Sequence, residues 1–430
     1  MTRGLRVAVV SRAVYPLHGL GGLERSVYDL VRHLADAGVT VTLITRPPSA
    51  GPPLASAIHP AVTMQLVPYR TFPFAGRRGT TALDRSTAYP LFGERAGRAA
   101  WDLASAGSVD LVHGFGASVL GFARRRSRSA APLVLNPQGM EEFGGADPSG
   151  ARLKRVAYFP LRQAVLACAR AADCVIATDH ALEPMVRAHL RVPPEHVRVI
   201  PNALDLRVVD ALAAAADGAR VRHAAGIPPR DAVLLSVGRL EENKGFHVLI
   251  AALAALRDHA GLIAEGRWRW VLVDDGPFRG RLAAAVASAG LTNHIIMAGR
   301  LPDPELHAWY EGADLFVHPT LYEGSSLVTL EAMAHRRAVV GTTAGGLPDK
   351  VRQGVTGWLV PPGDASALAA AISGALGQRD RLPGMGLAGR ASVEREFSWT
   401  AAASATLRLY DDLLRGRCST LTASPGDFQS

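Results

Sequence analysis

The 430-residue chain has 48% hydrophobic residues and a net charge of +9, enough apolar material for about two or three globular domains, which excludes a disordered protein. No apolar run reaches the roughly 18 residues that span a bilayer, and the first residues lack the long apolar stretch and cleavage site of a secretory signal. The sequence therefore predicts a globular, cytoplasmic protein without a membrane-spanning helix.

The positive charge is unevenly distributed along the chain. Residues 1–205 contain 24 Lys and Arg against 15 Asp and Glu, so this half holds the whole excess. Basic runs lie at residues 77–78, 124–128 and 152–155. The skew predicts either an anionic partner, such as a membrane surface or a lipid-phosphate acceptor, or simply solvated arginine-rich faces. Nucleic acid is not expected, because no aromatic residues are interleaved with the arginines and no nucleic-acid motif is present.

The three cysteines, Cys168, Cys174 and Cys418, are odd in number and lack the spacing of metal ligands. We therefore expect no disulfide framework. The thiols are predicted to fill space in the core or on the surface.

The chain opens with an apolar strand over residues 5–12, a glycine-rich loop, an amphipathic helix and a second strand over residues 39–45. This order predicts a parallel, doubly wound sheet. Gly21 and Gly22 lie in the loop with the spacing Gly-x-Gly-Gly. Since this spacing differs from the dinucleotide fingerprint, a dehydrogenase is not expected.

Further strands of the first half are expected over residues 109–116, 172–178 and 196–205, and a strand followed by a loop is expected over residues 132–144. Helices are expected over residues 152–172 and 208–225. His113 is at the carboxyl end of its strand, where open α/β sheets bind ligands, and is therefore a candidate site residue. A purely structural histidine is the alternative.

The second half begins with an apolar strand over residues 231–237, followed by a loop that contains Arg239, Lys244 and Gly245. Two cations in a strand-to-helix loop at the carboxyl edge of a sheet are suited to neutralising a diphosphate, and the glycine allows the backbone to come close. A solvated basic loop is the alternative.

A second strand–loop–helix unit lies further along, with the strand over residues 313–320 and the loop Glu-Gly-Ser-Ser at residues 323–326. The glycine allows close approach of a ligand, the hydroxyls can cap the helix, and the helix N-terminus favours an anion. Glu331 follows about two turns into the helix. A nucleotide-sugar, with hydroxyls at both ends and a diphosphate between them, fits this arrangement, while an ordinary capped βα unit is the alternative.

These motifs resemble the donor site of glycosyltransferase family 4, the retaining enzymes of the GT-B fold. The resemblance rests on a Glu, seven residues and a second Glu at Glu323 and Glu331 before a Gly-Gly turn, on Arg239 followed by Lys244-Gly, and on Gly-Gly-x-Glu near the start. It extends over nearly the whole chain and is weakest between residues 58 and 190. Asp274 stands where the family has the first glycine of a Gly-Asp-Gly-Pro segment.

The resemblance implies transfer of a sugar, of the hexosyl type, from a nucleotide-diphosphate sugar to a hydroxyl acceptor such as a lipid-linked glycan. Retention of configuration, no metal and no cofactor are implied, and the context would be bacterial glycan, glycolipid or glycoside biosynthesis. The implied catalytic residues are Glu323, His113, Arg239 and Lys244. The implied donor-binding residues are Gly21, Gly22, Asn202, Arg239, Lys244, Gly299, Arg300, Glu323, Gly324, Ser325, Ser326, Leu327 and Glu331.

Within that resemblance, Glu323 would face the transferred sugar, Arg239 and Lys244 would hold the leaving pyrophosphate, and Glu331 would hold the ribose. The family often has two alternate histidines near His113, whereas here Phe115 takes the second position. The loop at residues 138–142 is a candidate for acceptor recognition.

The GT-B resemblance also implies two doubly wound domains that face a cleft. We expect an acceptor-side domain over residues 1–205, a donor domain over residues 206–398, a helix over residues 399–416 that crosses back to the first domain, and a disordered tail over residues 417–430. A site at the inner membrane surface would follow if the basic half binds anionic lipid.

Two other functions stay open on the sequence alone. A nucleotide-sugar epimerase or hydrolase of related fold would need cleft acid and base residues that we do not find, and would consume donor without an acceptor. A non-catalytic module that binds a nucleotide-sugar or a membrane surface would be expected to have lost Glu323 or Lys244, and both are present.

Overall fold

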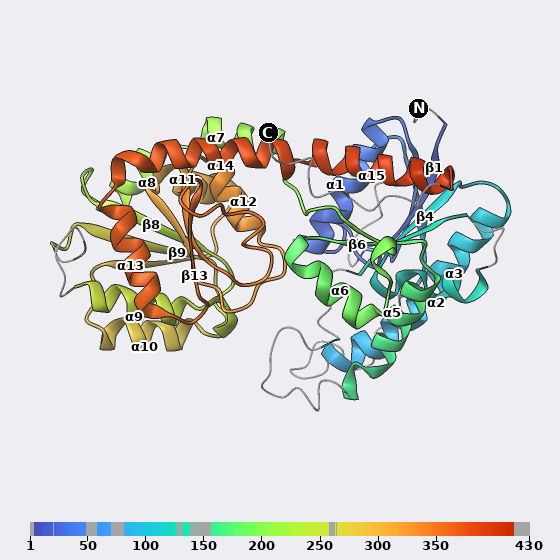
Figure 1. Ribbon diagram of the computed structural model, residues 1–430, viewed down its shortest axis with the longest axis horizontal. Helices are drawn as coiled ribbons and strands as arrows, with labels where there is room; N and C mark the ends of the chain where they lie inside the picture. The colour runs from blue at the N-terminus through green and yellow to red at the C-terminus, as the bar shows by residue number, and fades with distance from the viewer. Residues whose placement is uncertain are drawn as a thin grey trace. The chain divides into compact units, whose positions relative to one another are not determined.

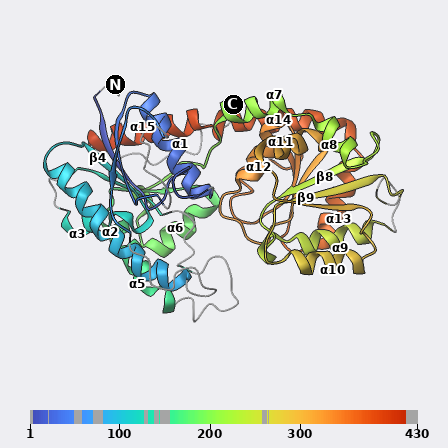
Figure 2. The same cartoon turned by 180° about the vertical axis from the view of Figure 1, so that it is seen from behind.

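The computed structural model describes residues 4–19, 21–48, 58–69, 81–126, 131–137, 143, 156–257, 263 and 265–416. The chain divides into two compact units, one made of residues 1–201 and 402–430 and the other of residues 202–401. Each unit is a parallel sheet covered by helices (Figure 1), and the covering is also visible from behind (Figure 2). The predicted α/β fold of two doubly wound domains is therefore confirmed.

The first unit contains a seven-stranded sheet in the order β3-β2-β1-β4-β5-β6-β7. Its strands are β1 (Arg6–Val10), β2 (Thr40–Thr45), β3 (Val62–Leu66), β4 (Leu111–Phe115), β5 (Leu133–Asn136), β6 (Cys174–Ala177) and β7 (Val197–Val199). The helices grouped with it are α1 (Gly22–Asp36), α2 (Thr81–Ser105), α3 (Leu120–Arg125), α5 (Phe159–Ala171), α6 (Glu183–Leu190) and, from residue 402 onward, α15 (Trp399–Leu414). The strand order reverses between β1 and β4, so a ligand is expected at their carboxyl ends.

The second unit contains a six-stranded sheet in the order β10-β9-β8-β11-β12-β13. Its strands are β8 (Ala232–Val237), β9 (Trp268–Val273), β10 (Ile295–Gly299), β11 (Leu315–His318), β12 (Ala338–Thr342) and β13 (Gly357–Val360). Its helices are α7 (Leu206–Ala215), α8 (Gly218–Ala224), α9 (Phe246–Leu256), α10 (Arg279–Ser288), α11 (Asp303–Gly312), α12 (Leu327–Ala334), α13 (Ala365–Leu376) and α14 (Leu382–Glu396). The order reverses between β8 and β11, which brings the two predicted loops to one switch point.

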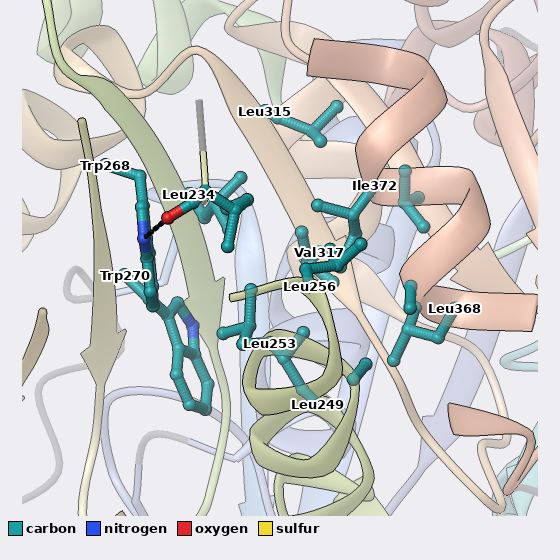
Figure 3. Packing of buried hydrophobic residues seen from close by; sticks show 14 of the residues in the cluster. Leu234, Leu249, Leu253, Leu256, Trp268, Trp270, Leu315, Val317, Leu368 and Ile372 are labelled. Atoms are coloured by element: carbon teal, nitrogen blue, oxygen red, sulfur yellow. Dashed lines mark hydrogen bonds between the residues drawn. The ribbon is translucent and has the colours of Figure 1, made fainter. Parts of the chain in front are cut away.

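The core of the second unit holds β8 and β11 in place. Leu249 and Leu253 of α9 are fully buried, as are Leu234 of β8 and Val317 of β11, and Figure 3 shows them gathered with Ile372 of α13. The strands read as continuous apolar runs because helices cover both faces of the sheet. Each buried leucine contributes about 2 kcal/mol. This packing therefore fixes the positions of the carboxyl ends of β8 and β11, from which the two candidate loops begin.

Two predictions of local structure differ from the structure. The single helix expected over residues 208–225 is wrong, because α7 ends at Ala215 and α8 begins at Gly218. Ala216 is extended and the Asp217 side chain caps α8 by accepting a hydrogen bond from the Arg220 N–H at 2.8 Å. The strand expected over residues 196–205 is only three residues long, Val197–Val199.

The basic run at residues 124–128 is paired within the protein where the structure describes it. Arg124 and Arg125 form ion pairs with Glu94 at 3.1 and 2.5 Å, and Arg126 pairs with Asp173 at 2.5 Å. These three arginines therefore favour the structural alternative over a free anion-binding surface. The other two runs, and the loop at residues 138–142, lie outside the described residues.

Two other sequence predictions concern cysteines and the membrane. Cys168 and Cys174 are buried free thiols, as expected of small core residues, and Cys418 lies outside the described residues. Within the described part of the chain, no helix is both long and apolar enough to cross a membrane.

Candidate functional site

The loops that follow β8 and β11 are bound to each other. The loop after β8 ends in Gly245, whose φ is +68°, and a Cβ atom there would lie 2.0 Å from the Pro319 carbonyl oxygen. The Asn243 carbonyl accepts the Leu321 N–H at 2.8 Å. Only glycine satisfies both the backbone conformation and the close approach, which explains why a glycine follows Lys244.

The Gly-Gly turn after β12 holds the same loop from the other side. Gly345 has a φ of +54°, and a Cβ atom there would lie 1.7 Å from the Glu323 carbonyl oxygen. The Gly346 N–H donates a hydrogen bond to the Gly324 carbonyl at 3.1 Å. The two glycines thus fix the backbone that carries Glu323, a physical role for the second half of the motif.

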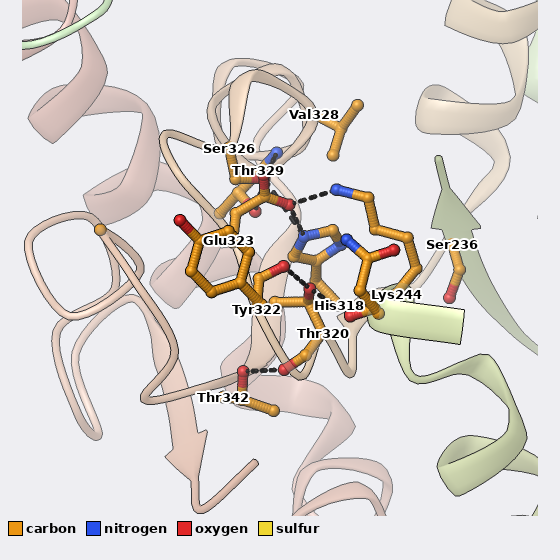
Figure 4. Close-up of polar contacts among 12 residues, drawn as sticks. Ser236, Lys244, His318, Thr320, Tyr322, Glu323, Ser326, Val328, Thr329 and Thr342 are labelled. Carbon is orange, nitrogen blue, oxygen red and sulfur yellow. Dashed lines mark hydrogen bonds and ion pairs between the residues drawn. The ribbon is translucent and has the colours of Figure 1, made fainter. Parts of the chain in front are cut away.

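The Glu323 carboxylate lies between two nitrogen groups (Figure 4). Its Oε2 atom accepts hydrogen bonds from Lys244 Nζ at 2.7 Å and from His318 Nε2 at 3.0 Å. The Glu323 and Lys244 side chains are 13% and 18% exposed, and the His318 side chain is fully buried. Two residues predicted from separate motifs therefore meet in one ion pair.

The environment of Glu323 keeps its carboxylate charged. Burial alone would raise its pKa, but the hydrogen bond from His318 and the charge of Lys244 outweigh burial and lower the pKa to about 2. Glu323 is therefore a fixed anion near neutral pH. A carboxylate of this kind can orient hydroxyl groups or offset positive charge, but it does not supply a proton.

Helix α12 begins at this loop. Ser326 is its N-cap, because the Ser326 Oγ accepts the Thr329 N–H at 3.3 Å, and that oxygen also lies 3.4 Å from His318 Nε2. Ser325 Oγ is buried and has no hydrogen-bond partner among the described residues. The N–H groups at the start of α12 favour an anion here.

Glu331, further along α12, is oriented by a tyrosine from a neighbouring helix. Tyr310 of α11 donates a hydrogen bond from its hydroxyl to Glu331 Oε2 at 2.8 Å. The Tyr310 ring stacks on His335 at 5.1 Å, and His335 is bonded to Glu311 at 2.7 Å. Burial, followed by the Glu331 charge, raises the pKa of Tyr310 well above its usual value, so the hydroxyl keeps its proton and remains a donor.

The two candidate arginines of the second unit are near the solvent. Arg239 is 61% exposed and pairs with Glu241 at 3.0 Å, and Arg300 is 74% exposed and pairs with Asp274 at 3.2 Å. Asp274, which replaces a family glycine, has a φ of 100°, and its N–H donates to the Gly299 carbonyl at 2.8 Å. Asp274 thus has a positive φ that a glycine would adopt without strain, whereas an aspartate adopts it at a cost in conformational energy.

His113 in the first unit is buried within the structure. Its Nδ1 atom lies 2.6 Å from the Tyr410 hydroxyl and its ring stacks on Phe115 at 5.0 Å. Burial lowers the pKa of His113 to about 3, so the ring is neutral. Nε2 is buried and has no hydrogen-bond partner in the described part of the chain. Any contact of His113 with a ligand would therefore be made by Nε2 in a neutral ring.

The remaining sequence candidates lie in different places. Gly21 is the N-cap of α1 and Gly22 its first residue, while Asn202 is the first residue of the second unit and is half-buried. Leu327 is half-buried at the start of α12. Among the described residues, no three His, Cys, Asp or Glu side chains converge as metal ligands would.

Sequence reasoning missed His318 and Tyr310. His318 ends an apolar strand five residues before Glu323, so the rule that selected His113, a histidine at the carboxyl end of a strand, would also have selected His318. Tyr310 gave no such signal, because its contact with Glu331 depends on how α11 packs beside α12.

Comparison with known proteins identifies relatives of both halves of the chain. Residues 20–208 match the model of Glycosyltransferase Family 4, and residues 231–378 match that of Glycosyl transferases group 1. A D-inositol 3-phosphate glycosyltransferase of Kribbella flavida is 30% identical over 424 residues, covering 94% of this chain and 95% of the relative.

Solved structures show the same fold over nearly the full length. Sucrose-phosphate synthase from Thermosynechococcus elongatus has a TM-score of 0.75 at 24% identity, covering 96% of this chain and 100% of that one. Anabaena HepE in complex with UDP has a TM-score of 0.69 at 19% identity, covering 95% and 100%.

Proposed function

Because this chain belongs to glycosyltransferase family 4, we propose that it transfers a sugar from a nucleotide-diphosphate sugar to a hydroxyl acceptor. The observation that carries the proposal is the Glu323 carboxylate held between Lys244 and His318 at the switch point of the second sheet. A related sugar transferase is named for D-inositol 3-phosphate, and a structural neighbour contains UDP, which is the ligand class proposed here.

The cations of the site would act on the leaving group. Lys244, which pairs with Glu323 at 2.7 Å, would also contact a phosphate beside that carboxylate, and exposed Arg239 would turn from Glu241 toward a diphosphate. Together with the N-terminus of α12 they would stabilise the charge that develops on the nucleoside diphosphate as the sugar leaves. Glu331, held by Tyr310, would accept the ribose hydroxyls.

We further propose transfer with retention of configuration and without a metal, as in the rest of the family. The bond between the anomeric carbon and the diphosphate oxygen breaks, and the acceptor oxygen forms a bond to that carbon from the same face. The acceptor proton passes to the departing diphosphate oxygen. Glu323, ionised and buried, would position the sugar through its hydroxyls.

The test is a thermal-shift and turnover screen against UDP-, GDP- and ADP-sugars, each with and without candidate acceptors. Stabilisation by one donor, with nucleoside diphosphate released only when an acceptor is present, is the expected result. Equal consumption of the donor without acceptor would instead support an epimerase or hydrolase. If no donor binds, the proposed roles of Arg239, Lys244 and Glu331 are wrong.

The two finer features are tested on the active enzyme. Activity should survive a chelator, and an NMR spectrum of the first product should show the donor's anomeric configuration. Attachment to an anionic membrane surface remains a prediction from the uneven charge, and sedimentation with phosphatidylglycerol vesicles tests it.

A further inference from the structure

A histidine of β4 and a tyrosine of α15 form a buried pair in the first unit. His113 and Tyr410 are 2% and 0% exposed, and His113 Nδ1 lies 2.6 Å from the Tyr410 hydroxyl. Tyr410 belongs to the part of α15 that is grouped with the first unit. The two residues are 297 positions apart in the sequence, so no local motif predicts their contact. We call them the His113–Tyr410 pair.

The hydrogen bond in this pair determines which ring nitrogen carries the proton. Among the described residues, the Tyr410 hydroxyl has His113 as its one hydrogen-bond partner. A buried hydroxyl whose proton found no acceptor would lose its hydrogen bond to water without a replacement, so the O–H donates to Nδ1. Burial raises the pKa of Tyr410 far above its usual value, so the hydroxyl keeps this proton. Nδ1 therefore presents its lone pair to Tyr410, and the proton of the neutral ring lies on Nε2.

Aromatic neighbours keep the ring neutral and fix its plane. The Phe115 ring stacks on the imidazole, with 5.0 Å between the ring centres and 7° between the planes. The Tyr410 ring meets the imidazole edge-on, at 5.9 Å and 84°. This enclosure excludes the water that would stabilise an imidazolium ion, which is why the pKa of His113 falls to about 3.

One group of the pair has no partner inside the described protein. His113 Nε2 is buried and makes no hydrogen bond to any described residue. An N–H group that stays unpaired in the interior lowers stability, and a ligand atom that accepts its hydrogen bond removes this cost. The strand order reverses between β1 and β4, where open α/β sheets bind ligands. The group that complements an N–H donor is an oxygen with an available lone pair, as in a hydroxyl or a phosphate.

We propose that Tyr410 is a positioning residue, which holds His113 in the neutral form with the proton on Nε2, so that His113 donates a hydrogen bond to a substrate oxygen. A general base must offer a lone pair, and the in-plane lone pair of this ring is bound to Tyr410. His113 therefore orients its ligand and does not remove the proton of the acceptor hydroxyl. This last consequence rests on the proposed transferase function, whereas the form of the ring does not.

The form of the ring is tested without any substrate. Nitrogen-15 NMR of protein labelled at its 14 histidines distinguishes a nitrogen that carries a proton from one that has a lone pair. The signals of His113 are those that disappear in His113→Gln and in His113→Asn. Nε2 should carry the proton and Nδ1 should not, without change between about pH 5 and pH 8. A proton on Nδ1, or titration of the ring in this range, would overturn the proposal.

The role of the tyrosine is tested with Tyr410→Phe and a matched control. Tyr410→Phe keeps the aromatic ring and removes the hydroxyl, so the Nδ1 signal should move to that of a nitrogen without a hydrogen bond. The control is Tyr89→Phe, because the Tyr89 hydroxyl donates to the Phe115 carbonyl at the end of the same strand, at 2.8 Å. This variant should leave the Nδ1 signal in place.

Circular dichroism checks that both tyrosine variants are folded. An Nδ1 signal that stays in place in folded Tyr410→Phe, or that moves equally in Tyr89→Phe, would contradict the role of the hydroxyl. If Tyr410→Phe does not fold, the wild-type spectrum alone decides whether the ring has the proposed form.

Turnover distinguishes a hydrogen-bond donor from a base. The amide of Gln places an N–H near the position of Nε2, whereas the shorter Asn amide reaches only the position of Nδ1. His113→Gln should keep kcat/KM within about tenfold of wild type, and His113→Asn should lose about tenfold more. Since an amide cannot take up a proton, equal losses of about 10² or more in both variants would indicate a base and overturn the proposal. If wild type turns over no nucleotide-sugar, the transferase function fails and the NMR result still decides the form of the ring.

Discussion

The carboxyl edges of the two sheets are charged in different ways. In the second unit the Glu323 carboxylate accepts hydrogen bonds from Lys244 and His318. In the first unit Arg12 and Arg46 are placed against the rings of Tyr69 and Tyr89. An ion pair fixes the direction of both of its side chains, whereas a ring face contacts a guanidinium without fixing the direction of its N–H groups. Hydrogen-bonded ion pairs therefore set the geometry of the second edge, and contacts with tyrosine rings hold the two arginines of the first.

The largest expected effect breaks the ion pair of the second edge. Glu323→Gln and Lys244→Met should each lower kcat/KM by about 10² to 10³, because each removes a charge that acts on the donor. Steady-state kinetics at saturating acceptor measure the loss. The double variant should lose less than the product of the single losses, since the two residues act together.

The control for this prediction is stability. The pair is mostly buried, so removing one partner leaves the other charge unpaired and should lower the free energy of unfolding by about 1 to 3 kcal/mol. Urea denaturation at neutral pH separates this effect from catalysis. Either single variant that is folded and fully active would remove its residue from the site.

The second effect is the pH dependence of the same pair. The pKa of Glu323 is about 2 when folded against a usual value of 4.5, so the ionised carboxylate stabilises the fold above the unfolded pKa, and this contribution disappears as the pH falls toward 2. The stability advantage of wild type over Glu323→Gln should therefore shrink between about pH 5 and pH 2, by up to about 3 kcal/mol. Urea titrations across this range measure it, and a constant difference would contradict the lowered pKa.

The third effect concerns His318, which positions Glu323. His318→Leu should lower kcat about ten- to thirtyfold because the carboxylate loses one of its two donors. His318→Gln places an amide N–H near the position of Nε2 and should recover part of the activity. A purely structural role would instead give equal losses in both variants, in proportion to their lost stability.

The smallest effect tests the hydroxyl that orients Glu331. Tyr310→Phe keeps the ring stacked on His335 and removes only the hydrogen bond to Glu331. The donor KM should rise about three- to tenfold with little change in kcat, since the ribose is bound equally in ground and transition states. An unchanged KM for the donor would place Glu331 outside the ribose site.

Much of the second edge could be predicted because its residues are local in sequence. Arg239, Lys244, Glu323 and Ser326 each follow an apolar strand at short distance, so the parallel fold alone brings their loops to the same edge. The helix of residues 208–225 was mispredicted because its division depends on a single capping residue and not on the composition of the segment. Its alanine content favours one helix, but Asp217 offers a cap that starts a second.

The sequence by itself determined the fold class, the family and the loops that carry the donor motifs, because strand periodicity and glycine spacing are local properties of the chain. Only the tertiary structure decided which charges meet. The contacts of Glu323 with His318 and of Glu331 with Tyr310 depend on strand ends and helix packing. The contacts of Arg12 and Arg46 with Tyr69 depend on β1, β2 and β3 being neighbours in the sheet. Those distances come from the packing of the cores, which no short segment encodes.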